Sequence, residues 1–558
     1  MGKYSIGIDF GSLSARAVLM DVETGAIAAS AVYHYPHGIY ETALPDGTPL
    51  GPDSALQEAE DYWNALHALI PEVLSLAGAA GSEVTGIGLD VTSCTILPTT
   101  KEGVPLSSLP QFRSRPHAYV KMWKHHGGAP YVERIREMAE KRGEPWLLQF
   151  GGSISSEHYL PKVMQMAAED PELYNAAERI IEMGDWLTWH LCGREVRGYT
   201  AAAFKTFYSP ENGDLSPDFL AALHPLLGDL NEKHPGEIVC GGDRAGCLSA
   251  EAAAWLGLPA GIPVSAPAVD AHVTLTGCHI AERGKLLLVI GTSTCAMLLS
   301  DVYREVEGIS GVVKEGILPD LNAYEAGQSC VGDLFAWFTR TCVPPEYHAE
   351  AKEAGVSLHE LLAQKAARLK VGESGLVALD WWNGVRSTLM DFDLSGLLVG
   401  MTLRTTPEEL YRAALEATAY GARRIIEALE NAGVPIDSIY AAGGIPCKNP
   451  LLMQIYADVC GREVHLVAQE HTGALGSAIL GAAAAESEEG FRILPALTRK
   501  YCREGGRVYR PIEENVRIYE QLYAVYRRLY DHFGKGDPIM KELKDIRLHG
   551  GTTPGSRA

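Results

Sequence analysis

Short apolar runs of strand type alternate along the chain with longer apolar stripes at helical spacing. Residues 5–8 and 15–21 are apolar runs, separated by the short polar turn 9–12, whose sequence is DFGS. A gap this short between two strand-like runs predicts a β-hairpin. A related pattern recurs at 285–300 around the turn 291–293, GTS. Strands interleaved with helical stripes predict an α/β protein.

The recurrence of the hairpin indicates a duplicated architecture. We expect one half at 1–278, a second at 279–496, and a C-terminal helical extension with a tail at 497–558. Apolar hairpins with Gly-Ser or Gly-Thr turns are common, so coincidence is an equally good reading of this one pair. The duplication therefore stays an open hypothesis at this point.

Helix signals are clearest in the second half. Thr406, followed by Pro-Glu-Glu, predicts a capped helix start with an apolar stripe behind it, and Asn449 before Pro450 predicts another. Segment 472–485 is rich in Gly and Ala, so its backbone can approach a neighbour closely. Aromatic residues at helical spacing in 516–533 predict a docking helix, and the tail 549–558 is predicted to be disordered.

Composition and charge exclude several classes of function. The chain has 558 residues, and 48 Lys and Arg against 70 Asp and Glu give a net charge of −22. This excess argues against a binder of nucleic acid or of an anionic membrane. Eleven scattered Cys without a CxxC pair, no signal-peptide pattern and no apolar run of 18 residues favour a reducing, cytoplasmic location.

The usual local motifs of several enzyme classes are missing. The chain has no phosphate-binding GxxxxGK[ST] loop, no complete GxGxxG, no HExxH and no GxSxG. P-loop NTPases, dinucleotide-dependent oxidoreductases, zinc proteases and α/β-hydrolases therefore lack support from the sequence.

The remaining candidates for a functional site are the glycine-rich turns themselves. Backbone N–H groups and hydroxyls in Gly-Ser and Gly-Thr turns can hold phosphate oxygens, and Asp9 can hold Mg²⁺ through its waters. A third Gly-rich turn, 442–446, leaves room for a flat ring against the backbone. Asp270 lies between a Pro-bounded strand and a helical run, where we expect it to stay ionised and to take a proton from an alcohol. An ordinary N-cap is the alternative role for Asp270.

Taken together, these residues resemble the FGGY carbohydrate kinases of the sugar kinase/Hsp70/actin superfamily. Residues 7–12 look like the family's first phosphate loop, 291–293 like its second, and 442–449 like its adenosine loop. Segment 396–416 fits the C-terminal signature of the family. The resemblance implies two actin-like (ribonuclease-H-like) α/β domains flanking a deep cleft.

The resemblance also assigns roles to residues. It implies Asp270 as the catalytic base and Asp9 as the residue near Mg²⁺. The residues implied for MgATP phosphates are Asp9, Gly11, Ser12, Ser14, Arg16, Gly291, Thr292 and Ser293, and those for adenosine are Gly443, Gly444, Lys448 and Asn449.

Sugar-site candidates follow from chemistry and position, because a polyol needs hydrogen-bond partners and often an aromatic face. Thr92, Ser93 and Cys94 end an apolar strand, and Trp123 and Lys124 offer an aromatic face and a donor. A second group consists of isolated charges among small or apolar residues. Among all candidates for the sugar site, we favour Lys205, Glu325 and the base Asp270 most strongly.

Within the family, segments 55–62, 122–126, 151–157, 380–386 and 416–423 resemble the L-ribulose kinases. The implied function is transfer of the ATP γ-phosphate to the primary 5-hydroxyl of a ketopentose, L-ribulose in L-arabinose catabolism, with ATP and Mg²⁺ as cofactors. D-ribulose or ribitol is the alternative substrate. An actin- or chaperone-like ATPase that ignores sugars is the alternative from another class. The implied partners are small molecules, and a homodimer is one open possibility for the assembly.

Overall fold

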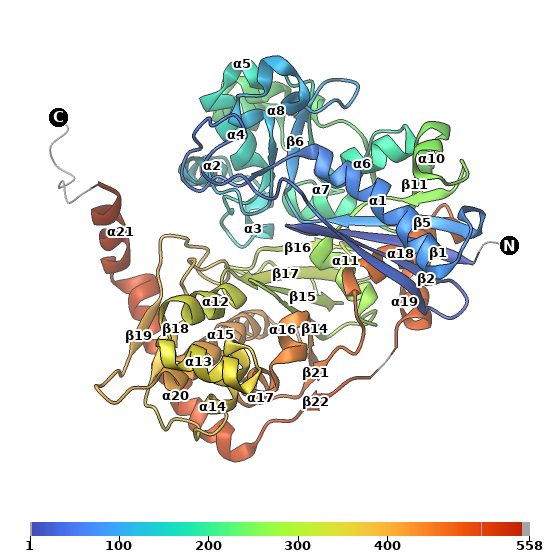
Figure 1. Cartoon of the computed structure of the whole chain (residues 1–558). Coiled ribbons are helices and arrows are strands. Elements are labelled where there is room, and N and C mark those ends of the chain that lie inside the picture. The colour runs from blue at the N-terminus through green and yellow to red at the C-terminus, as the bar shows by residue number, and fades with distance from the viewer. Residues whose placement is uncertain (1–2, 504, 550–558) are drawn as a thin grey trace, which may run out of the picture.

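The structure, a computed structural model, describes residues 3–503 and 505–549. Two mixed sheets, one in each half of the chain, form its frame (Figure 1). The strands of the first sheet are β1 (Tyr4–Phe10), β2 (Ser14–Asp21), β3 (Ile27–His34), β5 (Val84–Val91), β11 (Arg244–Cys247), β12 (Pro263–Ser265) and β13 (Ala268–Val269). Their order is β11-β12-β5-β1-β2-β3, with β13 beside β5.

The second sheet repeats the central part of the first. Its strands are β14 (Lys285–Ile290), β15 (Thr294–Ser300), β16 (Gly311–Lys314), β17 (Asn322–Gln328), β20 (Ser438–Ala442), β21 (Val464–Leu466) and β22 (Val508–Tyr509), in the order β16-β17-β15-β14-β20-β21-β22. In each sheet the first hairpin strand also pairs in parallel with a later strand, β1 with β5 and β14 with β20. Both predicted hairpins are confirmed, and the repeated order supports the duplication.

The first half carries two groups of helices. Helices α1 (Ala59–Ala77), α6 (Met183–Cys192) and α10 (Ala250–Leu256) pack on the first sheet around one apolar core. A second core lies under α2 (Ala129–Arg142), α3 (Trp146–Gln149), α4 (Tyr159–Glu169), α5 (Pro171–Ala176), α8 (Pro217–Leu223) and α9 (Leu230–Lys233). A four-stranded sheet accompanies this second group, made of β4 (Leu56–Gln57), β6 (Ile96–Thr99), β7 (Val120–Lys121) and β8 (Arg179–Glu182). The short strands β9 (Val196–Gly198) and β10 (Glu237–Val239) pair separately. Helix α7 (Tyr199–Lys205) leads from β9 towards the second sheet.

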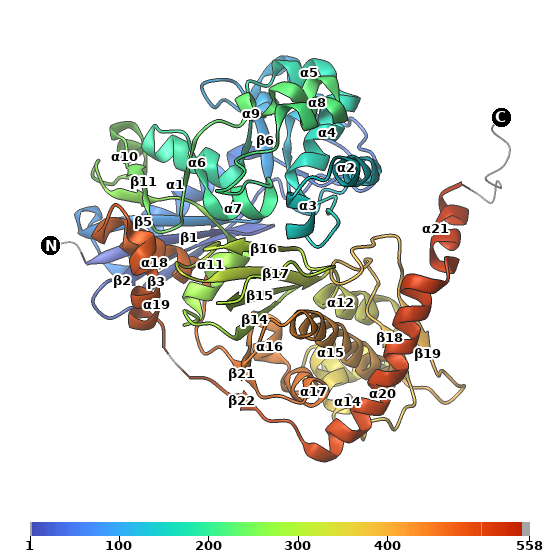
Figure 2. The same ribbon diagram turned by 180° about the vertical axis from the view of Figure 1, so that it is seen from behind.

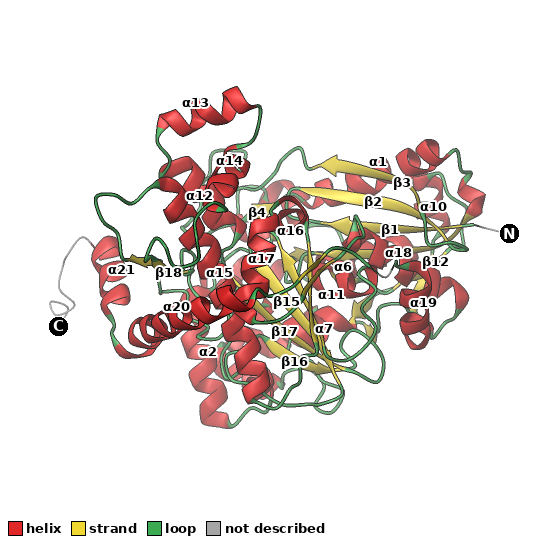
Figure 3. Ribbon diagram, turned by 90° about the horizontal axis from the view of Figure 1, so that it is seen from below, coloured by secondary structure: helices red, strands yellow, loops and turns green. Residues whose placement is uncertain are grey.

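Two helices fill the space between the sheets. Figure 3 shows α11 (Asp270–Gly277) and α18 (Thr472–Glu486) beside strands of both sheets. The two helices share one apolar core with residues of both hairpins. Helix α18 lies so close to β1 and β5 that a Cβ on Gly7 would come within 1.9 Å of the Ala474 carbonyl oxygen. The close approach expected of this Gly- and Ala-rich segment is therefore confirmed, and it joins the second half to the first sheet.

The remaining helices cover the second sheet and the C-terminal side. They are α12 (Gly332–Thr341), α13 (Pro345–Ala354), α14 (Leu358–Ala366), α15 (Pro407–Asn431), α16 (Gly444–Lys448), α17 (Pro450–Cys460), α20 (Glu513–Asp531) and α21 (Ile539–His549), with the two-stranded ribbon β18 (Val377–Leu379) and β19 (Leu397–Val399). Helix α19 (Leu494–Tyr501) instead packs on α18 and α11, in the core between the sheets. The two predicted helix starts are confirmed. The Thr406 N–H donates to Glu409 Oε2 at 2.7 Å, and Asn449 Oδ1 accepts from the Leu452 N–H at 3.0 Å.

The C-terminal segment is helical and docked, as predicted. Four tyrosines of α20 are buried in the core of the second half, namely Tyr519, Tyr523, Tyr526 and Tyr530. Of the tail expected to be disordered, residue 549 ends α21 and residues 550–558 lie outside the described part of the chain. Within the described ranges, no helix is long and apolar enough to cross a membrane.

Candidate active site

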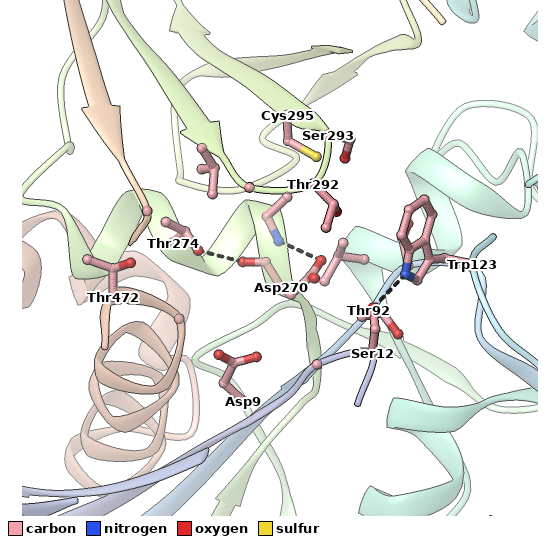
Figure 4. Close-up of a pocket in the computed structure, with 18 of the residues that line it drawn as sticks. Asp9, Ser12, Thr92, Trp123, Asp270, Thr274, Thr292, Ser293, Cys295 and Thr472 are labelled. Carbon is pink, nitrogen blue, oxygen red and sulfur yellow. Dashed lines mark hydrogen bonds between the residues drawn. The ribbon is translucent and has the colours of Figure 1, made fainter. Parts of the chain in front are cut away.

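A cavity of about 880 Å³ opens between the two halves. Both hairpin turns, the residues that follow β5, the start of α11 and the turn before α16 contribute to its wall (Figure 4). The predicted site residues that line it are Asp9, Gly11, Ser12, Arg16, Thr92, Ser93, Cys94, Trp123, Lys205, Asp270, Gly291, Thr292, Ser293, Glu325, Gly443, Gly444 and Lys448. Residues far apart in the sequence thus meet at one place.

Three predicted residues do not line this cavity, namely Ser14, Lys124 and Asn449, and the last of these lines a neighbouring cavity described below. Ser14 is buried at the start of β2, where its carbonyl accepts the Gly11 N–H at 3.0 Å and so shapes the turn. Lys124 forms an ion pair with Glu41 at 2.6 Å. Lys124 was expected to donate to the sugar, but the Glu41 carboxylate binds it outside the cavity.

The first turn is held at its base and at its tip. Asp9 and Arg16 are register partners across the hairpin, and Arg16 Nη1 lies 3.7 Å from Asp9 Oδ2. At the tip, Trp123 Nε1 donates to Ser12 Oγ at 2.9 Å (Figure 4). This bond connects the turn to the segment that follows β7.

A second carboxylate, which sequence reasoning did not select, stands beside the first turn. Asp90 on β5 is the parallel register partner of Asp9 and is fully buried, with Ser477 Oγ of α18 donating to it at 2.6 Å. Burial and the neighbouring charge of Asp9 raise the pKa of Asp90 well above its usual value. The available signal was an acid in an otherwise apolar strand, at the same distance from the strand end as Asp9.

Asp270 is the first residue of α11 and lies at the middle of the cavity (Figure 4). Its Oδ1 accepts the Ala271 N–H at 2.7 Å. Burial, and then the charge of Asp9, raise the pKa of Asp270 to about 7. Desolvation and Asp9 thus oppose the Ala271 N–H bond, which favours the ionised form, so Asp270 titrates near neutral pH. A carboxyl with a pKa near 7 is well matched to proton transfer at neutral pH.

Lys205 and Glu325 form a buried ion pair in the cavity wall. Lys205 Nζ lies 2.6 Å from both carboxylate oxygens of Glu325, and His272 Nε2 lies 3.0 Å from Glu325 Oε2. Burial alone would raise the pKa of Glu325, but Lys205 and His272 lower it well below its usual value. The two isolated charges of the sequence are therefore partners, fixed in place and able to direct hydrogen bonds into the cavity.

Arg386 is a further cavity residue that the sequence analysis did not assign to the site. It is partly buried, donates through Nη2 to Glu157 Oε1 at 2.9 Å, and lies with its guanidinium 5.9 Å from the ring centre of Trp123. Glu157 belongs to the first half and Arg386 to the second, so this pair crosses the cleft. Both residues lie in segments quoted for the resemblance, and a lone arginine beside two tryptophans and an asparagine was the usable signal.

The second turn is fixed by backbone bonds and carries no acid. The N–H groups of Val331 and Gly332 donate to the carbonyls of Thr292 and Gly291 at 2.9 and 3.0 Å. Beyond this turn lies a second cavity of about 1110 Å³, which Asn449 lines together with Gly444, Lys448 and residues of α12 and α14. Shared lining residues make the two cavities neighbours.

Comparison with known proteins agrees with this geometry. The sequence model for the N-terminal domain of the FGGY family of carbohydrate kinases matches residues 4–277, and that for its C-terminal domain matches 286–485. The chain is 48% identical over 538 residues to a ribulokinase of Bacillus licheniformis, covering 96% of this chain and 98% of the relative. A ribulokinase of Mycolicibacterium smegmatis is 46% identical over 556 residues, with 98% and 96% covered.

Solved structures share the fold. A xylulose kinase from Rhodospirillum rubrum superposes with a TM-score of 0.76 at 22% identity, covering 96% of this chain and all of that one. Plasmodium falciparum glycerol kinase with ADP gives 0.72 at 16% identity, with 94% and 98% covered. The expected fold of two actin-like domains is confirmed, as is the resemblance read from the sequence motifs. The chain belongs to the FGGY family of carbohydrate kinases, enzymes that use ATP to phosphorylate sugars.

Proposed function

We propose that the chain transfers the γ-phosphoryl group of ATP to the primary 5-hydroxyl of L-ribulose. One observation carries the proposal: the carboxylate of Asp270 lies in a single cavity with both hydroxyl-bearing turns and with the Lys205–Glu325 pair. The ketopentose is inferred from the relatives named ribulokinase, which match almost the full length of the chain.

In the proposed reaction Asp270 takes the proton of the 5-hydroxyl as this oxygen attacks the γ-phosphorus. The new O–P bond forms while the bond from the γ-phosphorus to the bridging oxygen breaks, and ADP leaves with that electron pair. In this proposal the hydroxyls of Ser12, Thr292 and Ser293 would hold the phosphate oxygens. The N–H groups of Gly11 and Gly291 close the turns by donating to the Ser14 and Ser293 carbonyls. Alignment and electrostatics supply most of the rate enhancement.

Magnesium fits the residues at the first turn. The described residues contain no group of three or more side chains able to bind a metal ion directly. Asp9, however, lines the cavity among other carboxylates, and burial raises its pKa, so a cation there would offset costly negative charge. Bound with ATP, Mg²⁺ would neutralise phosphate charge, and Asp9 would hold it through water.

The two substrates are proposed to occupy different parts of the cleft. The sugar would lie near Lys205, Asp270 and Glu325, and the adenosine near Gly443, Gly444 and the second cavity lined by Asn449. Sugar binding would favour closure of the two halves, which excludes water from ATP. A cytoplasmic location is part of the proposal, as the scattered cysteines without a CxxC pair favour. A homodimer stays a prediction that light scattering would check.

An ADP-release assay across ketopentoses and pentitols tests the proposal. We expect L-ribulose to give the highest kcat/KM. A clear preference for D-ribulose or ribitol would reassign the substrate within the family. ADP release that does not depend on any sugar would contradict the proposed function as a whole.

A further inference from the structure

The segment 380–395, between β18 and β19, enters the cleft from the second half, and we call it the cleft loop. Three of its residues, Arg386, Met390 and Phe392, line the main cavity. The Arg386–Glu157 ion pair joins the loop to the first half, and Phe392 packs against His126 of that half with ring centres 5.7 Å apart. The cleft loop therefore lines the cavity and also contacts the first half of the chain.

The cleft loop is bonded to β17 beside the proposed sugar site. The Ser387 N–H donates to the Gly327 carbonyl at 3.1 Å, and the Gly327 N–H donates back to Ser387 Oγ at 3.2 Å. Glu325 is two residues earlier on the same strand. A displacement of the loop would therefore shift β17 and, with it, the position of the Glu325–Lys205 ion pair.

Helix α20 holds the cleft loop from behind, through buried tyrosines. The Tyr526 hydroxyl donates to Asp380 Oδ1 at 2.9 Å, and the Tyr530 hydroxyl is hydrogen-bonded to Thr388 Oγ1. The ring of Tyr530 also packs edge-on against Trp381, with centres 5.3 Å apart and planes at 74°. These contacts fix the first half of the loop to the C-terminal segment.

Helix α21 holds the other half of the cleft loop. Lys541 Nζ lies 2.6 Å from Asp391 Oδ2, and the Ser395 N–H donates to Met540 Sδ at 3.4 Å. Figure 2 shows α20 and α21 as one continuous arm along β18 and β19, on the outer side of the second half. Contacts of this arm thus cover the loop from residue 380 to residue 395.

The arm lies outside the part of the chain that the family models match, which ends at residue 485. The cleft loop itself contains only isolated bridges and turns, so its order depends on contacts with neighbours. A loop that is already ordered loses less conformational freedom when a ligand binds. An external arm is a physically efficient way to keep such a loop ready for its ligand.

We propose that α20 and α21 brace the cleft loop and thereby set the affinity for the sugar without touching it. Tyr530 is the central positioning residue of this brace. The inference rests on the proposed function, because it assumes that the cavity beside Glu325 takes a ketopentose. It adds that residues 513–549 tune the sugar side of the cleft and leave the ATP side unaffected.

The test compares two tyrosine variants of the full-length protein, Tyr530→Phe and Tyr523→Phe. Tyr523 is a matched control: it is equally buried on the same helix, its hydroxyl donates to Glu427 Oε2 at 2.7 Å, and an arginine lies over its ring as one does over Tyr530. Among the residues that the structure describes, its hydrogen-bond and ring partners lie outside the cleft loop. Each variant loses one partly buried hydroxyl hydrogen bond. The partner of Tyr523 is a carboxylate, so Tyr523→Phe should lose at least as much folding stability as Tyr530→Phe and controls for a general loss of stability.

We expect Tyr530→Phe to raise the KM for L-ribulose by about threefold to tenfold, the worth of one hydrogen bond, and to leave the KM for ATP within about twofold. Tyr523→Phe should leave both values near those of the wild type. Amide hydrogen exchange should become faster in peptides covering 380–395 only in Tyr530→Phe.

Equal exchange of the loop in both variants would overturn the brace, whatever the kinetics. Faster exchange with an unchanged sugar KM would overturn its role in substrate affinity. If the wild-type enzyme phosphorylates no ketopentose, the proposed function fails instead, and the exchange comparison still decides whether the arm holds the loop.

Discussion

The two hairpin turns occupy equivalent places in the two sheets but carry different chemistry. The β1–β2 hairpin has an acid near its turn, Asp9, paired with Arg16 and placed next to the buried Asp90. The β14–β15 turn has hydroxyls and no acid, and backbone bonds from residues 331 and 332 hold it in place. One frame, used twice, therefore offers a charged side and a neutral side to the same cavity. The difference teaches that the repeated hairpin sets the position of each turn, while the individual side chains set its charge and its chemistry.

Asp270, at the start of α11 between the two turns, gives the largest expected effect. Asp270→Asn keeps the shape but removes the base, so kcat should fall by about 10²-fold or more. The KM for ATP should change little, because the phosphate turns are intact. Steady-state kinetics with the sugar and ATP varied in turn would check this. Near-normal turnover would remove Asp270 from its proposed role.

Substitution within the turns tests the charged side against the neutral side. Asp9→Asn should raise the Mg²⁺ concentration needed for half-maximal rate by about tenfold to a hundredfold, as loss of an outer-shell metal partner does. Thr292→Val, the matched change in the second turn, should leave that concentration within about twofold. Rates measured over a Mg²⁺ series at fixed ATP provide the readout. Equal shifts in both variants would erase the proposed division between the turns.

Blocking the nucleotide side should leave the sugar side intact. A Cβ at Gly444 would meet no atom within 4 Å, so Gly444→Trp should fold and fill open space shared by the two cavities. We expect ATP affinity to fall by about tenfold or more, while sugar affinity stays near that of the wild type. Calorimetry with each ligand measures both affinities. The reverse pattern would place the nucleotide elsewhere.

The pH dependence gives the smallest expected effect over the neutral range. Burial and the charge of Asp9 raise the pKa of Asp270 to about 7, and the base works only when deprotonated. The rate at low substrate concentrations should therefore fall as pH decreases, to about half its plateau at pH 7 and about a tenth at pH 6. The residual rate of Asp270→Asn should lack this inflection. A flat profile between pH 6 and 8 in the wild-type enzyme would contradict the assignment.

Local patterns were sufficient for much of the fold. Both hairpins, the starts of α15 and α17, and the docking helix α20 were predicted because turn residues, caps and apolar periodicity act over a few neighbouring positions. The close approach of α18 was also predicted, from its Gly and Ala content. The partner of that helix was not, because no local pattern shows that Gly7 and Gly88 meet a segment more than 380 residues away.

The candidate site divides in the same way. Glycine turns and isolated charges singled out Asp9, Asp270, Lys205 and Glu325 as residue types suited to phosphoryl transfer. The position of Lys124 was misread, because Glu41 engages it outside the cavity. Arg386 was not assigned to the site, because its partner Glu157 is 229 residues away.

The sequence by itself determined the family, the repeated hairpins and the set of groups available for chemistry, since motifs and periodicities are short-range properties. Only the tertiary structure decided which of these groups face one another and in what protonation state. Burial beside Asp9 moved the pKa of Asp270 to about 7, and the arm of α20 and α21 came to lie behind the cleft loop. Desolvation and long-range packing depend on the whole fold, and no stretch of neighbouring residues encodes them.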